Sequence, residues 1–203
     1  MKLRAFHTLF FWSGAITMVV MSMHYFQNHI SGILKGKILV DQLWYHIVFR
    51  IHIVFGMIAM FAAPTQFSQT LRQRYMLWHK RFGYIYVVSV LLSGVSGFVI
   101  AQFAMGGIMS RIGFTILSVV WLVSTYKAIS SIIKKNIVGH QKWMIRSFAL
   151  TFSAIPLRLM LLIPLFFNVE FIEIYKLASW LCWIINLTIA EVIISQNKGI
   201  QTI

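Results

Sequence analysis

Long apolar runs, separated by short polar segments, make up nearly the whole of the 203-residue chain. A helix of about 20 apolar residues crosses the hydrocarbon core of a bilayer. Six runs are long enough, and we predict a transmembrane helix in each of them: residues 6–26, 46–66, 82–102, 111–130, 143–167 and 175–195. Pro64 lies at the end of the second run, whereas Pro156 and Pro164 lie inside the fifth and predict a kink there. The pattern therefore predicts an all-α fold, a polytopic membrane helix bundle.

The composition leaves no room for a separate soluble domain. Hydrophobic residues make up 59% of the chain and charged residues 11%, and the mean hydropathy is +0.80. A soluble globular domain carries about 25% charged residues. No segment is both polar enough and long enough to fold outside the membrane, so we expect residues 1–203 to form a single integral membrane domain.

The formal net charge of +14 comes mostly from the segments between the apolar runs. Ten cations fall on one side of a six-helix bundle: Lys2, Arg4, Arg72, Arg74, Lys80, Arg81, Lys134, Lys135, Lys142 and Lys198. The opposite side holds Lys35, Lys37 and Lys176 together with the acidic Asp41, Glu170 and Glu173. The positive-inside rule then predicts that both termini are cytoplasmic. Anionic lipid headgroups are the expected counter-charge, and we expect no nucleic-acid partner.

Polar residues inside the predicted helices fall into two layers when their depth is counted at about 1.5 Å per residue. The outer layer contains His52 and Arg158, and the layer near the cytoplasmic boundary contains Gln66, His79, His140, Arg146 and Glu191. Glu191 is the one acidic residue within a predicted span, where an uncompensated carboxylate costs at least about 2.5 kcal/mol. Arg146 has the same depth, so we predict an Arg146–Glu191 pair or a protonated Glu191. The pair is either structural or a proton or substrate site.

Two further polar residues need partners of their own. Arg158 has no acidic residue at its depth, so an anionic ligand, a haem propionate, a lipid phosphate or carbonyls freed by Pro156 must satisfy it. Asn186 lies in the middle of the last predicted helix, about 140° around the helix from Glu191. We therefore expect Asn186 and Glu191 to contact different neighbours.

Two histidine segments resemble each other, His79–Tyr84 and His140–Arg146. Each places a histidine and several cations directly before a long apolar run. Haem b is held in helix bundles by axial histidines, and His79 and His140 have matching depths. His52 could bind a second haem, with Arg158 near its propionates.

Other metal and redox chemistry finds less support in the sequence. The single cysteine, Cys182, excludes a disulfide framework, a Cys-x-x-Cys pair and c-type haem attachment. The helices carry no compact His-Glu-x-x-His spacing, so we expect no other metal site.

Several of these pieces together resemble a known group of membrane proteins. The matching residues are His52 with Gly56, Pro64–Phe67, His79–Tyr86, His140–Ser147, Arg158, Asn186, and Ala190 with Glu191. As a set they are similar to the uncharacterised bacterial family filed as domain of unknown function 2306, although Gln141 stands where that family often has a second cation. The resemblance implies a multi-pass protein of the bacterial inner membrane, and it brings no established activity.

Function therefore rests on the polar residues, and three hypotheses stay open. The first is an electron-transfer bundle that binds haem b through His52, His79 and His140. The second is a small-solute or proton-coupled transporter, and the third is a non-enzymatic membrane subunit or assembly factor. An enzyme acting on lipid or quinone, a homo-oligomer and a partner in a membrane complex also remain open.

Overall fold

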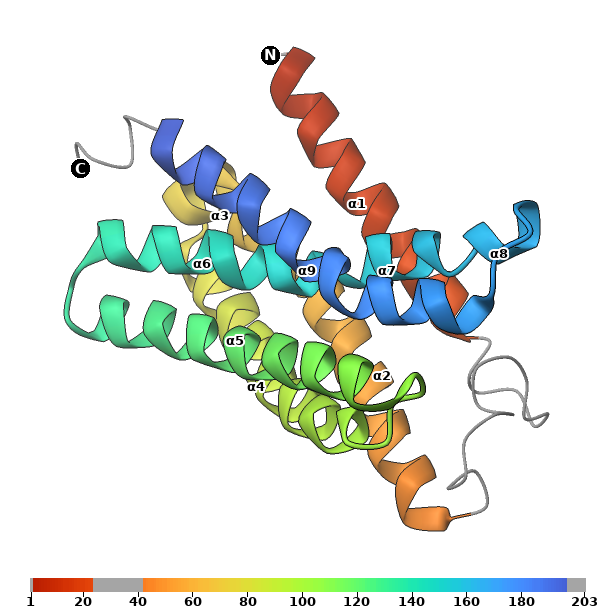
Figure 1. Ribbon diagram of the computed structural model, residues 1–203. Helices are drawn as coiled ribbons and strands as arrows, with labels where there is room; N and C mark the ends of the chain where they lie inside the picture. Colours follow the sequence, from red (N-terminus) through yellow and green to blue (C-terminus); the bar gives the residue numbers. More distant parts are fainter. Residues whose placement is uncertain (1, 24–41, 197–203) are drawn as a thin grey trace. The chain divides into compact units, whose positions relative to one another are not determined.

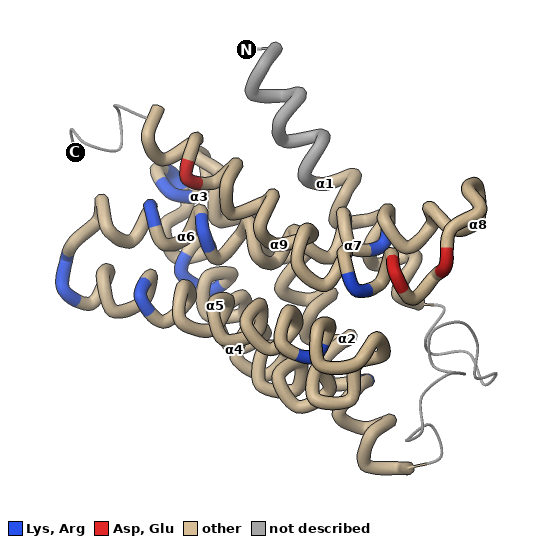
Figure 2. The backbone as a smooth tube through the Cα atoms, in the orientation of Figure 1, with Lys and Arg blue, Asp and Glu red and all other residues tan. Residues whose placement is uncertain are grey.

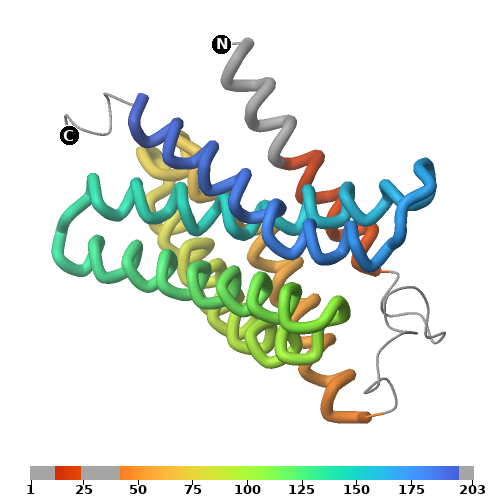
Figure 3. The backbone as a smooth tube through the Cα atoms, viewed as in Figure 1, coloured from red at the N-terminus to blue at the C-terminus, as the bar shows by residue number. Residues whose placement is uncertain are grey.

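The computed structural model describes residues 2–23 and 42–196, with side chains from Trp12 onward (Figures 1 and 3). Within these residues the chain forms nine helices and no strand. In chain order they are α1 (Lys2–Met23), α2 (Leu43–Gln66), α3 (Gln69–Arg74), α4 (Met76–Ala101), α5 (Gly107–Ile133), α6 (Ile137–Phe152), α7 (Ala154–Met160), α8 (Ile163–Phe166) and α9 (Phe171–Gln196). The predicted all-α fold is confirmed.

Five segments of the described chain are long and apolar enough to cross a membrane: Leu43–Gln66, Met76–Ala101, Gly107–Ile133, Ile137–Phe166 and Phe171–Gln196. They overlap the second to sixth predicted spans, as expected for a polytopic bundle. The first predicted span, 6–26, overlaps α1 and continues beyond the described residues, and the described apolar part of α1 is the shorter stretch Trp12–Met23. That span and the cytoplasmic termini stay predictions, because Lys2, Arg4, Lys35, Lys37, Asp41 and Lys198 lie outside the described side chains.

Two helices, α4 and α6, begin several residues before the apolar runs from which they were predicted, so each includes a basic segment at its start. His79 and His140 each occupy the fourth residue of a helix, α4 and α6 respectively. The Asn136 side chain caps α6 by accepting a hydrogen bond from the Gly139 amide at 2.8 Å. Hydropathy marks only the part of a helix that fits the hydrocarbon core, whereas capping and backbone hydrogen bonds decide where the helix starts.

Contacts between the helices divide the chain into two compact units, Met1–Ser96 and Gly97–Ile203, and their boundary falls within α4. We call them unit 1 and unit 2. The organisation of the chain as one integral membrane domain stays a prediction.

Unit 1 is held together by contacts that α2 makes with α1 and with α4. The Trp12 and Phe61 rings meet edge to face, with centroids 4.9 Å apart, and join α1 to α2. Ser93 Oγ of α4 donates to the carbonyl oxygen of His52 at 2.9 Å. A methyl group at Gly56 would lie 3.3 Å from that hydroxyl, so the small residue permits the close approach of α2 and α4.

Unit 2 is built on a hairpin of α5 and α6 that packs against α9. Two buried side-chain hydrogen bonds cross the hairpin, from Trp121 Nε1 to Thr151 Oγ1 at 3.0 Å and between Thr125 Oγ1 and Ser147 Oγ at 2.6 Å. Such bonds hold helices together where lipid offers polar groups no partner. The turn before α5 uses Gly106 and Gly107, with φ angles of 78° and 72°, a conformation that glycine adopts without strain.

The fifth predicted span is broken into α6, α7 and α8 (Figure 1). Pro156 lies in α7 and Pro164 in α8, where each lacks the amide hydrogen that would continue the ladder. At the first break the Ser153 amide donates to the Leu150 carbonyl at 3.2 Å instead of to Ala149. The predicted kink is therefore an interruption of the helix.

Candidate functional site

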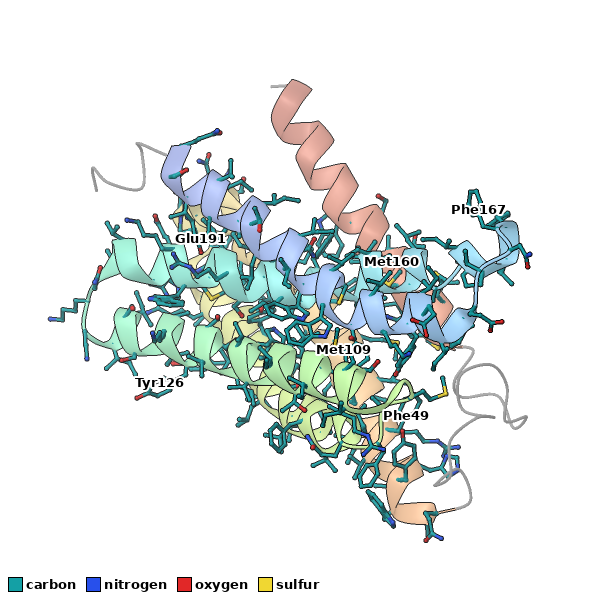
Figure 4. The ribbon with its side chains drawn as sticks, viewed as in Figure 1. Phe49, Met109, Tyr126, Met160, Phe167 and Glu191 are labelled. Atoms are coloured by element: carbon teal, nitrogen blue, oxygen red, sulfur yellow. The ribbon has the colours of Figure 1, made fainter. Side chains whose placement is uncertain are left out.

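An ion pair joins α6 to α9 within unit 2. Arg146 Nε donates to Glu191 Oε1 at 2.6 Å, and Arg146 Nη2 donates to Glu191 Oε2 at 2.8 Å. This two-point contact is the strongest geometry available to a guanidinium and a carboxylate. The Glu191 side chain is 53% exposed and that of Arg146 21%, and Figure 4 shows Glu191 on α9. The predicted Arg146–Glu191 pair is confirmed.

The Trp143 ring contacts Arg146 of this pair and also a second cation. Arg146 Cζ is 4.4 Å from the centroid of the indole ring, and Lys127 Nζ of α5 is 4.5 Å from the same centroid. Cations are attracted to an aromatic face at such distances. Lys127 forms no ion pair with a carboxylate in the described part of the chain. The cluster thus contains two cations and one carboxylate from three helices.

Sequence reasoning missed Lys127 and Trp143 as members of this cluster. Lys127 lies near the end of the fourth apolar run, where the sequence is compatible with a helix end. In the structure α5 continues to Ile133, so Lys127 is one and a half turns inside the helix, beside α6. The antiparallel pairing of α5 and α6, which brings these residues together, leaves no signal in either segment alone.

Asn186 supports the break between α6 and α7 and does not contact Glu191. Its Nδ2 donates to the Ala149 carbonyl at 3.0 Å, and Ser153 Oγ donates to the same oxygen at 3.1 Å. That carbonyl lost the Ser153 amide at the break, so the two side chains replace the missing backbone bond. The expectation of different neighbours for Asn186 and Glu191 is confirmed.

Arg158 lies in α7, within unit 2, and is half-buried. Its Nη1 donates to the Ala154 carbonyl of the same helix at 3.2 Å. This carbonyl is not the one that Pro156 frees, since the missing amide of Pro156 would have bonded to the carbonyl of Phe152, so the partner predicted for Arg158 stays a prediction. The structure thus places Arg158 at the broken segment and Arg146 on the intact α6.

His140 and His52 each contact a backbone carbonyl of a neighbouring helix through ring nitrogen Nδ1. His140 Nδ1 lies 2.9 Å from the Ala128 carbonyl of α5, and His52 Nδ1 lies 2.9 Å from the Ser93 carbonyl of α4. A carbonyl can only accept, so Nδ1 carries the hydrogen in both residues and the lone pair of a neutral ring is on Nε2. This orientation is typical of histidines that bind a metal through Nε2.

The three candidate histidines are divided between the two units. His140 is the single histidine of unit 2, whereas His52 and His79 belong to unit 1. Ser93, which contacts His52, lies fourteen residues after His79 in α4, or about 21 Å along the helix. Among the described residues, no group of three His, Cys, Asp or Glu side chains could hold a metal ion.

Gln66 and His79 meet at one end of unit 1. Gln66 Nε2 donates to the backbone carbonyl of His79 at 3.4 Å and to Thr65 Oγ1 at 3.1 Å. A methyl group at Gly83, one turn after His79, would lie 3.1 Å from Gln66 Oε1. The shared depth of Gln66 and His79 in the sequence corresponds to this contact between α2 and α4.

A family model described as predicted membrane protein, DUF2306, matches residues 49–194. The chain belongs to this family. The match runs from α2 into α9 and covers parts of both units and every candidate residue named above. No curated protein and no solved structure matches the chain. Family membership and the five membrane-length segments together indicate a multi-pass membrane protein, so any activity has to be argued from the cluster in unit 2.

Proposed function

We propose that this DUF2306 protein is a proton-coupled transporter of a small anionic solute, with Arg146 and Glu191 as its central site. The observation that carries the proposal is the accessible two-point ion pair between two membrane-length helix segments. Ionisable residues inside membrane spans are expensive, and they mark substrate and proton pathways.

The chemistry of the pair suggests how proton and anion binding are linked. When Glu191 is ionised, its two oxygens occupy Nε and Nη2 of Arg146. A proton on the carboxylate removes the negative charge, and the guanidinium then attracts an anion from solution. One proton and one anion bind together and leave together, because each state with only one of them leaves an uncompensated charge among the helices.

The interrupted α6–α7–α8 segment supports transport. Broken membrane helices are typical of transporters, because freed backbone groups line the binding site and the break permits movement. Here the break follows Arg146 by six residues on the same segment and is held by Asn186 of α9, the helix that also carries Glu191. Movement of α9 against α6 would therefore act on the ion pair and the break together.

The test is proton flux in liposomes that contain the purified protein and an internal pH-sensitive dye. External addition of small anions, namely carboxylates, phosphate and sulfate, is expected to acidify the interior for at least one of them. Glu191→Gln and Arg146→Gln should each abolish that acidification. Glu173→Gln is the matched control, because it breaks the Lys176–Glu173 pair of 2.6 Å at the other end of α9. Absence of flux with every anion, or equal flux in Glu191→Gln, would reject the proposal.

Haem b binding is a second candidate, favoured by the Nδ1 contacts of His52 and His140. Since unit 2 has a single histidine, a two-histidine site that uses His140 cannot be formed within unit 2 of one chain. An absorption spectrum of the detergent-purified protein, oxidised and then reduced with dithionite, tests this candidate. A Soret band that His140→Ala or His52→Ala weakens supports it, and a spectrum with only the aromatic band after expression with ample haem removes it.

The proposal includes a location and an assembly. We place the protein in the bacterial inner membrane, with the α5–α6 turn and the termini in the cytoplasm, because Lys134 and Lys135 lie at that turn. Few helices are available per chain to enclose a solute pathway, so we expect a homo-oligomer. Light scattering of the detergent complex tests the assembly, and a strictly monomeric active protein would contradict it.

A further inference from the structure

We infer that Lys127, Trp143 and Arg146 form a binding site for a phosphate group, with Glu191 as the residue that positions Arg146. This inference rests on the proposed function for its place in the molecule and names the chemical class of the anion. Lys127 comes from α5, and Trp143 and Arg146 come from α6. The site contains none of the histidines that the haem candidate uses.

The first step of the argument is the excess of positive charge. Lys127 Nζ and Arg146 Cζ each lie within 4.5 Å of one indole centroid, so the two cations are no farther apart than twice that distance. Lys142 lies one turn before Arg146 on the same face of α6. Glu191 is the one carboxylate that contacts this group in the described chain. Figure 2 shows the same imbalance, with basic positions along the α5–α6 hairpin and an acidic one on the facing end of α9.

The second step is the set of donors that remain available. Glu191 occupies Nε and Nη2 of Arg146, and Nη1 makes no hydrogen bond to the described residues. Lys127 is exposed and also makes no hydrogen bond there; its ammonium is held over the ring by the cation–π contact alone. Two cations that contact the same ring thus each keep donors for a third group.

The third step selects the ligand. A free monocarboxylate would have to compete with Glu191, which is tethered beside Arg146 at a high effective concentration. A phosphomonoester carries a charge of about −1.5 to −2 at pH 7 and three acceptor oxygens. It can accept from Lys127 Nζ and Arg146 Nη1 at once, and the proton that the proposed function puts on Glu191 removes the negative charge that would repel it. The geometry therefore favours phosphate over carboxylate ligands.

The phosphate can come from solution or from a lipid headgroup, and the two sources are tested separately. In the first arm, inorganic phosphate is titrated into the detergent-purified full chain at constant ionic strength, and the Kd is measured by calorimetry. In the second arm, the Tm is compared between nanodiscs of phosphatidylcholine alone and nanodiscs that also contain phosphatidic acid, whose headgroup is a phosphomonoester.

Two variants and one control decide whether the site is the one named. Lys127→Gln and Arg146→Lys should each raise the phosphate Kd at least about tenfold, since each removes a charge-assisted or forked contact. Lys134→Gln removes a cation from the same hairpin without touching Trp143, and it should change the Kd less than about twofold. Lys127 is exposed, so its variant is expected to fold normally.

Each outcome has a defined meaning. Phosphate binding in detergent that depends on Lys127 and Arg146 supports a soluble phosphate site. A Tm increase only with phosphatidic acid, lost in the same variants, supports a site for a headgroup phosphate. No effect in either arm, or equal losses in Lys127→Gln and Lys134→Gln, overturns the inference. The flux assay is independent, so phosphate can bind in a protein that moves no protons, and flux of another anion can occur in one that does not bind phosphate.

Discussion

Asn186 of α9 donates a hydrogen bond to the Ala149 carbonyl at 3.0 Å, at the point where the Ser153 amide has turned away from that oxygen. The contact explains how a membrane-embedded helix can be interrupted without leaving a backbone acceptor unsatisfied. Ser153 Oγ donates to the same oxygen at 3.1 Å, so the Ala149 carbonyl accepts one hydrogen bond from the residue that ends α6 and one from α9.

Replacing Asn186 with Leu should destabilise the protein by about 1 kcal/mol, the net value of one hydrogen bond in a partly buried setting. The loss should grow when Ser153→Ala is added, because Ala149 then loses both side-chain donors. Thermal unfolding in detergent measures both effects. Thr188→Val is the control, since Thr188 bonds only within α9, to Ile184, and is exposed. An Asn186→Leu protein as stable as the unmodified chain would contradict this role.

The Arg146–Glu191 pair should show non-additive effects in a double-mutant cycle. Removal of one partner leaves the other charge uncompensated near the membrane, whereas removal of both leaves none. Because Glu191 is 53% exposed, we expect a coupling energy of only about 1 kcal/mol, at the upper end for exposed pairs. Unfolding of Glu191→Gln, Arg146→Gln and the double variant gives this value.

The comparison pair for that cycle is Lys176 with Glu173, which are three residues apart on α9 and 2.6 Å apart. Pairs of this kind on one helix contribute about 0.2–0.5 kcal/mol. Purely additive losses at Arg146 and Glu191, or a coupling energy no larger than that of the Lys176–Glu173 pair, would show that the two-point contact adds no stability beyond that of an ordinary surface pair.

The long helices and the ion pair could be predicted from the sequence because both depend on quantities that run along the chain. The length of an apolar run sets a span, and the positions of Arg146 and Glu191 within their runs set matching depths. The partner of Asn186 could not be predicted in the same way. It depends on which carbonyl the break frees, and that follows from the local path of Ser153.

The contacts around Trp143 could not be predicted from the sequence for a related reason. Depth brings Lys127 and Trp143 to one level, but only the rotation of α5 and α6 about their axes decides that Lys127 meets the ring. The resemblance of the His79 and His140 segments was a weaker guide. The two histidines belong to separate units: the His79 carbonyl accepts a hydrogen bond from Gln66 of α2, and the His140 ring contacts the Ala128 carbonyl of α5.

Substitution of Gly113 with Ala should weaken the packing of α5 on α9. A methyl group there would lie 2.8 Å from the Ser179 carbonyl oxygen and 3.0 Å from Trp180 Nε1. Backbone cannot move aside as a side chain can, so we expect a loss of about 1–3 kcal/mol in unfolding free energy. Gly83→Ala is the matched control, because its new methyl group meets only the movable Gln66 side chain. Similar Tm values for the two variants would contradict the close approach at Gly113.

The orientation of the α5–α6 turn can be measured by thiol labelling, because Cys182 is the single cysteine of the chain and is buried. In a Cys182→Ser background, Lys134→Cys places a thiol at the basic turn, and Phe167→Cys places one at the opposite end of unit 2, where Phe167 is 65% exposed. If the basic turn is cytoplasmic, a membrane-impermeant maleimide should label only the Phe167→Cys protein in intact cells, and both variant proteins in broken cells. Labelling of the Lys134→Cys protein in intact cells would reverse the assignment. The Arg146–Glu191 pair would then open towards the outside, and the proton that binds Glu191 would come from there.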